Sequence, residues 1–267
     1  MADMSSIEGV LLGAVQGVTE FIPVSSSGHL VVAQHFLGLP ASPTFDSLIN
    51  LGTFLALVIY FRKRLWDITV RLFTKRETRL IRNIAISAAP VLAVGFLLKS
   101  LIESPVVQSA WVVVGTLVFV GFIMIVLERL PRASTVASYE SLSPKRALAV
   151  GLAQMCALIP GVSRSGSSII AGRLAGLSYA KAAEYSFLLS IPVMFAVVVL
   201  GFAGHEGRDF IANNFWLWLT SNIAAFTFGI IAVGFMLRFL SKGNLVGFGW
   251  YRIGLAFVVI AVLVTVG

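Results

Sequence analysis

The feature that most constrains this chain is a succession of long apolar stretches that covers nearly its whole length. Several reach the roughly 20 residues that a helix needs to cross about 30 Å of hydrocarbon. Of the 267 residues, 58% are hydrophobic and 12% are charged, whereas a soluble domain carries about 25% charged residues. The stretches are continuous and do not alternate as barrel strands do. The sequence therefore predicts an all-α polytopic membrane protein, in which each helix satisfies its own backbone hydrogen bonds.

Six of these stretches are long enough to span a membrane, and the charges between them set the topology. We predict transmembrane helices at about 45–62, 83–101, 109–128, 184–203, 220–240 and 247–266. Lys and Arg gather in loops after the first, third and fifth spans, and the loops near Glu103 and around His205–Asp209 are nearly free of them. The positive-inside rule places the basic loops in the cytoplasm and both termini outside, on the periplasmic side. Because topology accounts for the net charge of +8, we expect no nucleic-acid partner.

Two further apolar segments, about 7–38 and 147–178, are each interrupted midway by a cluster of Pro, Ser and Gly. Such a cluster ends a straight helix. At membrane depth, irregular backbone is tolerated only where it is buried in protein or lines a watery cavity. We therefore predict that each segment forms a re-entrant helical hairpin, which is two half-helices joined by a turn.

The two interrupted segments resemble each other, which indicates an internal repeat. At a constant offset of 138 residues, the matching pairs are Gln16 and Gln154, Val24 and Val162, Ser25 and Ser163, Ser27 and Ser165, and Gly28 and Gly166. We predict one membrane domain, 1–267, with one repeat at about 7–130 and another at about 145–267. Each repeat holds one hairpin and three spans, so the second is inverted relative to the first. In such inverted-topology repeats, sites form near the midplane from half-helix ends.

The residues after each break suit an anion such as phosphate. A half-helix that begins there turns its free N–H groups and its positive dipole end towards the membrane interior. The candidate substrate-binding residues are Ser25, Ser27, Gly28, Ser163, Ser165 and Gly166. Arg164 adds a guanidinium that can hold phosphate through two hydrogen bonds.

Glu20 and Arg164 stand out because they are ionisable groups in membrane segments. Such a group costs roughly 2.5–3.5 kcal/mol on insertion scales, so it persists for a functional reason or as the partner of another such group. Gln16 and Glu20 are four residues apart and share a helix face, as Ser26 and His29 do at a spacing of three. These residues are the candidates for chemistry.

Two motifs carry a resemblance to a known family. VQGVTEFIPVSSSGHL (Val15–Leu30) and PGVSRSGSS (Pro160–Ser168) resemble those of the undecaprenyl pyrophosphate phosphatase family, also called the bacitracin-resistance family. The resemblance covers essentially the whole chain. It implies a metal-dependent hydrolase of the bacterial inner membrane that converts undecaprenyl pyrophosphate to undecaprenyl phosphate and inorganic phosphate. That reaction recycles the lipid carrier of peptidoglycan synthesis and confers bacitracin resistance.

The resemblance also implies roles for the candidate residues. Glu20, with Gln16, is expected to hold a divalent cation, Mg²⁺ or Ca²⁺, because hard cations prefer oxygen ligands. Family members carry Glu or Gln at the position of Gln16, so here Glu20 carries more of that binding. Arg164 is expected to stabilise the developing charge. Ser26 attacks phosphorus with His29 taking or orienting its proton, or else His29 is the general base for direct attack by water.

Other interpretations stay open at this stage. Inverted repeats with broken helices are a transporter architecture, so an inverted-repeat transporter or flippase for an anionic or lipid-phosphate substrate is the alternative. The Glu, Ser, His and Arg set exceeds what simple anion binding needs, which favours the hydrolase. The sequence leaves a homodimer open, and it does not say which leaflet the site opens to.

Overall fold

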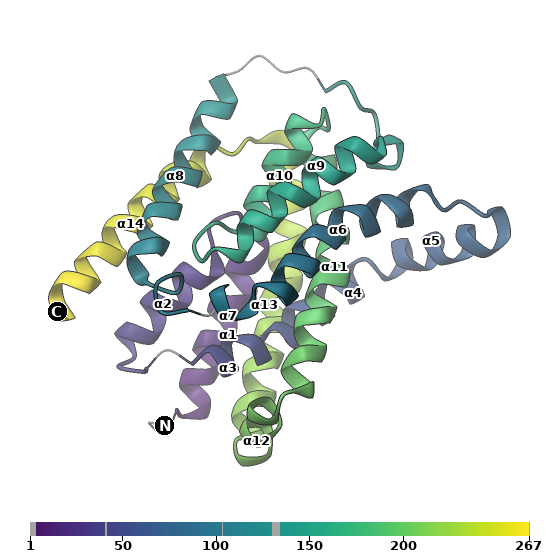
Figure 1. The fold of residues 1–267 in the computed structure, drawn as a ribbon. Helices are drawn as coiled ribbons and strands as arrows, with labels where there is room; N and C mark the ends of the chain where they lie inside the picture. The colour runs from purple at the N-terminus through teal and green to yellow at the C-terminus, as the bar shows by residue number, and fades with distance from the viewer. Residues whose placement is uncertain (1–3, 41, 103, 130–133, 267) are drawn as a thin grey trace.

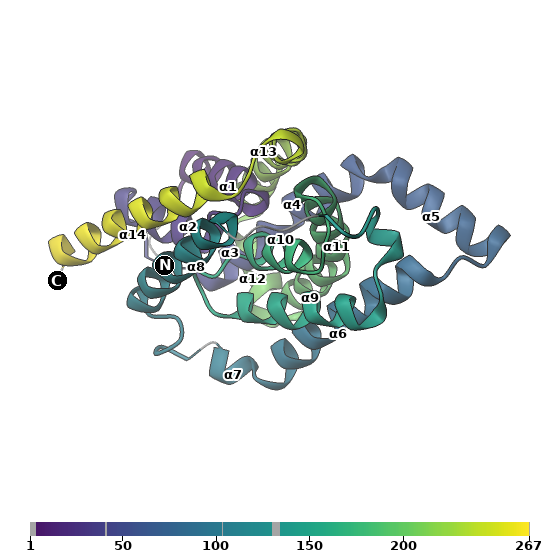
Figure 2. The same cartoon turned by 90° about the horizontal axis from the view of Figure 1, so that it is seen from above.

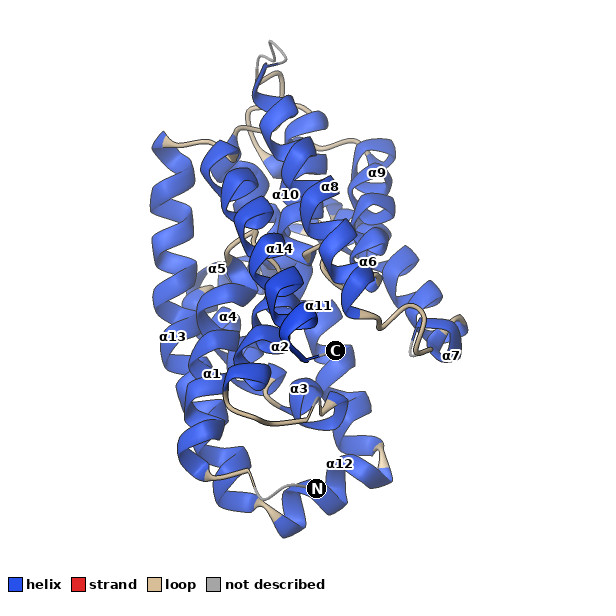
Figure 3. Ribbon diagram, turned by 90° about the vertical axis from the view of Figure 1, so that its left-hand side faces the viewer, coloured by secondary structure: helices blue, strands red, loops and turns tan. Residues whose placement is uncertain are grey.

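The computed structural model of the protein describes residues 4–40, 42–102, 104–129 and 134–266, and these ranges form helices and connections without a strand (Figure 3). The helices before the midpoint are α1 (Ser6–Phe21), α2 (Ser26–Phe36), α3 (Pro43–Leu48), α4 (Asn50–Tyr60), α5 (Arg62–Lys75), α6 (Arg79–Leu97), α7 (Lys99–Ile102) and α8 (Ala110–Arg129). They are followed by η1 (Tyr139–Ser141), α9 (Pro144–Met155), η2 (Cys156–Leu158), α10 (Arg164–Leu174), α11 (Tyr179–Ala203), α12 (His205–Asn213), α13 (Phe215–Lys242) and α14 (Val246–Val266).

Six helical stretches of the described chain are long and apolar enough to cross a membrane, which confirms the number and the places of the predicted spans. They are Pro43–Tyr60, Arg79–Leu97, Ala110–Arg129, Tyr179–Ala203, Phe215–Lys242 and Val246–Val264. The first consists of α3 and α4, which are separated at Ile49. Helix α11 begins earlier than predicted because the Ser178 side chain caps it, accepting a hydrogen bond from Lys181 N at 3.3 Å.

Two segments predicted as loops are helices instead. The His205–Asp209 segment belongs to α12, whose buried Phe210 packs against Phe45 with ring centroids 6.0 Å apart. The basic segment after the first span forms α5, which projects from the other helices and exposes Trp66 and Phe73 (Figures 1 and 2). Both helices are amphipathic, and neither contains an apolar run of membrane length. Glu103 lies outside the described residues.

Each segment predicted as a hairpin consists of two helices around a short break. Residues 22–25 separate α1 from α2, and η2 with residues 159–163 separates α9 from α10. In Figures 1 and 3 the first pair lies in the lower half of the molecule and the second pair in the upper half. The two breaks therefore approach each other from opposite ends. Re-entry into a membrane and the inverted relation of the two halves stay predictions.

Glycines let the first helix of each pair approach a transmembrane helix closely. Helix α1 packs along α13, and α9 packs along α6. A Cβ added to Gly13 would lie 2.1 Å from Ser221 O, and one added to Gly151 would lie 2.4 Å from Ser87 O. Small residues at such positions are the usual means of close helix packing in membranes.

We predict that Gly13→Ala destabilises the protein, because the added methyl group collides with a backbone carbonyl of α13 that cannot move alone. The expected loss is about 1–3 kcal/mol, the usual cost of overpacking. Thermal unfolding of the purified protein in detergent micelles measures it. Gly115→Ala in α8 is the matched control, since a Cβ there meets nothing within 4 Å. Equal melting temperatures for both variants would contradict this packing.

Candidate functional site

The two breaks have the same local structure. Ser25 and Ser163 precede α2 and α10 with φ of 75° and 72°, in the left-handed region that residues other than glycine seldom adopt. The Ser25 side chain accepts a hydrogen bond from Gly28 N at 3.4 Å, and the Ser163 side chain accepts one from Gly166 N at 3.1 Å. Backbone strain of this kind costs about 1–3 kcal/mol and gathers at functional sites. Helices α2 and α10 thus begin directly after these two serines, where the sequence predicts the second half-helix of each segment.

The breaks also contact each other. Ser27 Oγ accepts a hydrogen bond from Gly161 N at 3.2 Å, which joins the first motif to the second. Ser165 Oγ lies 3.3 Å from the backbone oxygens of both Glu20 and Ile22. The start of α2 and the start of α10 are thereby held side by side.

Four of the predicted residues, Gln16, Glu20, Ser26 and Arg164, form one hydrogen-bonded group, called the central cluster below. Arg164 Nη2 donates to Glu20 Oε1, and the two side chains are 15% and 10% exposed. Glu20 Oε2 accepts from Ser26 Oγ at 2.7 Å and from Gln16 Nε2 at 3.0 Å. The two ionisable groups are thus partners of each other. The carboxylate is also placed to take a proton from the Ser26 hydroxyl.

Asn50 of α4 fixes the orientation of the Gln16 amide. Asn50 Nδ2 donates to Asp46 O at 2.8 Å and to Ser47 O at 3.3 Å, so its other atom, Oδ1, is left to accept. Oδ1 takes a hydrogen bond from Gln16 Nε2 at 3.2 Å. The Gln16 nitrogen is thus committed to Asn50 and Glu20, and the Gln16 oxygen is the atom it can offer to a ligand.

His29 lies beside the central cluster and has partners of its own. Its Nδ1 is 2.7 Å from Ser25 O, and its Nε2 is 2.7 Å from the hydroxyl of Tyr251. The two rings are stacked, with centroids 5.6 Å apart. No hydrogen bond among the described residues joins His29 to Ser26, whose hydroxyl is bound to Glu20 instead.

Arg252 of α14 is a residue that the sequence reasoning missed. It is fully buried and donates to Gly161 O at 2.5 Å, to Pro23 O at 3.3 Å and to Thr116 O at 3.4 Å. Its guanidinium therefore bridges the two breaks. The signal was present, because an arginine inside an apolar span meets the same criterion that singled out Arg164.

The central cluster does not fit a cation held by the protein alone. Among the described residues, no group of three or more His, Cys, Asp or Glu could hold a metal ion. Glu20 is the one carboxylate of the cluster, and its oxygens already accept from Arg164, Ser26 and Gln16. Mg²⁺ and Ca²⁺ need six or more oxygen ligands, several of them usually carboxylate or phosphate.

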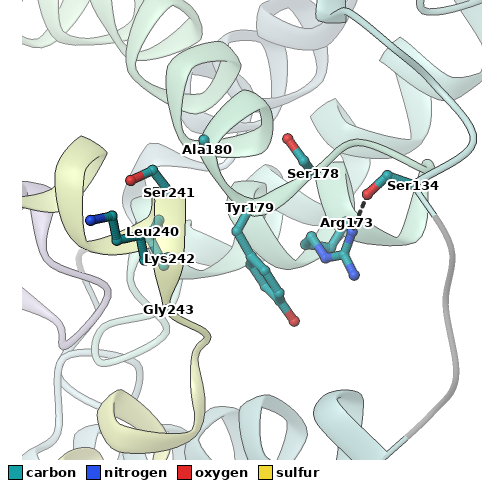
Figure 4. Close-up of a pocket in the computed structure, with 9 residues that line it drawn as sticks. All are labelled: Ser134, Arg173, Ser178, Tyr179, Ala180, Leu240, Ser241, Lys242 and Gly243. Atoms are coloured by element: carbon teal, nitrogen blue, oxygen red, sulfur yellow. Dashed lines mark hydrogen bonds between the residues drawn. The ribbon is translucent and has the colours of Figure 1, made fainter.

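Two cavities in the described protein lie away from the cluster. The one drawn in Figure 4 has about 250 Å³ and is lined by residues at the ends of α10, α11 and α13, including Arg173, Tyr179 and Lys242. A second, of about 520 Å³, lies between α5, the start of α6 and η1, among Arg64, Arg71 and their acidic partners. None of the predicted site residues lines either cavity.

Comparison with known proteins gives a consistent result. Residues 9–258 match the family model described as Bacitracin resistance protein BacA. The chain is 39% identical to an undecaprenyl-diphosphatase of Campylobacter hominis, over 95% of this chain and 97% of that protein. It is 37% identical to one of Rubrobacter xylanophilus, over 96% and 98%, and 38% identical to one of Burkholderia mallei, over 96% and 94%.

We predict that neutral His29 carries its hydrogen on Nδ1, because the carbonyl oxygen of Ser25 can only accept and Nε2 then accepts from Tyr251. Nitrogen NMR of histidine-labelled protein distinguishes the two tautomers. The variant His35→Gln/His205→Gln leaves His29 as the single histidine and assigns the signal. Tyr251→Phe should shift the Nε2 resonance and keep the tautomer. Hydrogen on Nε2 in the unchanged site would refute this geometry.

Proposed function

Because the chain belongs to the Bacitracin resistance protein BacA family, we propose that it is an integral membrane phosphatase that hydrolyses undecaprenyl pyrophosphate. The products are undecaprenyl phosphate and inorganic phosphate. The observation that carries the chemistry is the contact of the Ser26 hydroxyl with the Glu20 carboxylate, beside the Arg164 guanidinium. A nucleophile, a proton acceptor and an anion-binding group thus lie together within the helical bundle.

The proposed reaction begins at Ser26. Its Oγ forms a bond to the terminal phosphorus as the bond from that phosphorus to the bridging oxygen breaks, and undecaprenyl phosphate leaves. The hydroxyl proton passes to Glu20, whose Oε2 lies 2.7 Å from Oγ. Water then attacks the phosphoserine: its oxygen forms a bond to phosphorus as the bond from phosphorus to Ser26 Oγ breaks. Glu20 returns its proton to Ser26 Oγ, and inorganic phosphate leaves with the protons of the water.

The start of α10 supplies the groups that stabilise the transferred phosphoryl oxygens. Arg164 is its first residue, and Ser163 precedes it as the cap. Unsatisfied backbone N–H groups and the positive dipole end gather at such a start. Preorganised donors of this kind are the main source of phosphoryl-transfer catalysis, because little covalent work is left to the protein.

His29 defines the second scheme, in which it activates water for direct attack on phosphorus. Its Nδ1 is held by Ser25 O, so Nε2 is the nitrogen available to take a proton. Nε2 would have to exchange the Tyr251 hydroxyl for that water. The direct bond of Ser26 to Glu20 favours the serine scheme. A transporter or flippase, the alternative that the repeat raises, has no support from the family or from the named relatives.

The phosphatase proposal is tested by phosphate release from undecaprenyl pyrophosphate, using purified protein in detergent with added Mg²⁺. The serine scheme predicts that Ser26→Ala and Glu20→Gln each slow release at least about a hundredfold, because the nucleophile or its proton acceptor is lost. Arg164→Gln should also reduce it strongly. Ser241→Ala, on the exposed end of α13, is the matched serine control.

Two results would change the proposal. If Ser26→Ala still releases phosphate at a substantial rate and His29→Gln does not, direct attack by water is the mechanism and the serine scheme is wrong. Absence of release from folded wild-type protein would refute the phosphatase.

We further propose that the chain lies in the bacterial plasma membrane with both termini periplasmic and the basic segments cytoplasmic. The positive-inside rule supports this orientation, since α5 and the start of α6 carry seven of the 20 Lys and Arg residues in one connection between spans. The halves 7–130 and 145–267 would then form an inverted repeat. The matching caps at Ser25 and Ser163 and the paired packing of α1 on α13 and α9 on α6 support that relation.

Orientation is tested with a membrane-impermeant maleimide on spheroplasts. Cys156→Ser removes the one native cysteine, and single cysteines then replace the exposed His205 of α12 or the exposed Lys75 of α5. We expect labelling of His205→Cys in intact spheroplasts and of Lys75→Cys only after permeabilisation. The reverse pattern would place the basic segments outside.

A further inference from the structure

The charge of the central cluster determines whether a cation or an anion can bind to it first. Its one carboxylate, Glu20, is neutralised by Arg164 within a largely buried pair. A second cation, Arg252, is buried at the same breaks and has backbone oxygens as partners. The Asp46 carboxylate accepts a hydrogen bond from Gln34 Nε2 at 2.8 Å, and no hydrogen bond among the described residues joins that carboxylate to the central cluster. A lone divalent cation therefore meets a carboxylate that is already paired and a second buried positive charge, whereas an anion is attracted.

The hydrogen bonds at Glu20 lead to the same conclusion. Its Oε1 accepts from Arg164, and its Oε2 accepts from Ser26 and Gln16. Each carboxylate oxygen has two lone pairs, so Oε2 is saturated and Oε1 keeps one acceptor position beside a guanidinium. A cation could bind there only if Arg164 moved away, and that would leave a buried guanidinium without its partner.

Gln16 supplies the central cluster with an oxygen that carries no charge. Asn50 and Glu20 both take hydrogen bonds from its nitrogen, so Gln16 offers its amide oxygen as a ligand. An amide oxygen is a weaker ligand for a hard cation than a carboxylate, and it leaves the charge of the cluster unchanged. The missing negative charge has to come with the substrate.

We propose that the Glu20–Arg164 pair is the resting form of the site, and that a divalent cation binds only together with a pyrophosphate group. The anion draws Arg164 away from Glu20, and the freed Glu20 oxygen and the Gln16 oxygen then hold the cation against the phosphate. The proposal rests on the phosphatase function and adds the order and coupling of binding. The cation is thereby a partner of the substrate, and it does not reside in the protein.

Thermodynamic linkage makes the coupling measurable from both sides. If pyrophosphate tightens cation binding by a given factor, the cation tightens pyrophosphate binding by the same factor. Methylenediphosphonate is a suitable probe because its P–C–P bridge resists hydrolysis, and Mn²⁺ is a suitable cation because it is readily quantified. Equilibrium dialysis of the full-length protein in a neutral detergent counts both ligands, with a protein-free chamber as reference for the complex that they form in solution.

For the wild-type protein we expect Mn²⁺ binding to tighten at least about tenfold when methylenediphosphonate is present, with an equal reciprocal effect. Tight binding of one Mn²⁺ per chain without the diphosphonate would overturn the proposal. So would binding of the two ligands without coupling.

Two variants should bind Mn²⁺ without the diphosphonate. Gln16→Glu adds a second carboxylate to the cluster, and Arg164→Gln frees the Glu20 oxygen that the guanidinium occupies. Gln108→Glu makes the same charge change at an exposed residue between α7 and α8, so it should bind Mn²⁺ as the wild type does. The proposal is contradicted if neither Gln16→Glu nor Arg164→Gln binds Mn²⁺ in the absence of the diphosphonate. Both variants must first elute from a size-exclusion column as the wild type does.

The Mn²⁺-binding experiment and the phosphate-release assay test the two proposals separately. Phosphate release together with uncoupled Mn²⁺ binding would refute this inference and leave the proposed function standing. Coupled binding without phosphate release would support the site and refute the function.

Discussion

Backbone that leaves its helix inside a membrane protein has to find other hydrogen-bond partners, and at the two breaks these partners also build the site. Ser25 and Ser163 cap the helices that follow, each with its own side chain. The carbonyls before them are bound by side chains from α8 and α14: Thr116 Oγ1 donates to Pro160 O at 2.7 Å, and Arg252 donates to Pro23 O and Gly161 O. The requirement for backbone satisfaction therefore brings the starts of α2 and α10 together, as the proposed anion site requires.

Much of this arrangement is readable from the sequence because it depends on local or periodic patterns. Apolar runs of membrane length predict the six spans, and the Ser-x-Ser-Gly spacing predicts where α2 and α10 begin. The cost of ionisable groups in apolar segments singles out Glu20 and Arg164, which the fold then pairs. The same patterns fail at α5 and α12, where amphipathic helices have too few apolar residues to resemble a span.

The remaining features depend on contacts between segments that are distant in the chain. Nothing near Asn50 indicates that its amide would orient that of Gln16, because the contact exists only once α4 packs beside α1. His29 is three residues from Ser26, and this spacing indicates a shared face. Its partners are nevertheless the Ser25 carbonyl and Tyr251, which arrives from α14. The cost of an ionisable residue in an apolar span also applies to Arg252 and could have singled it out. Its role as a bridge between the two breaks, however, depends on which carbonyls lie beside α14.

The Glu20–Arg164 pair connects the stability of the site to its chemistry. A buried ion pair repays the desolvation of its members only when both stay hydrogen-bonded, and breaking it is costly unless each member finds another partner. A pyrophosphate with its cation supplies both partners at once: anionic oxygens for the guanidinium and a positive charge for the carboxylate. An anion without a cation leaves Glu20 unpaired, and a cation without an anion leaves Arg164 unpaired. The energetics of burial alone therefore favour ligands that carry both charges, and that preference is a form of substrate specificity.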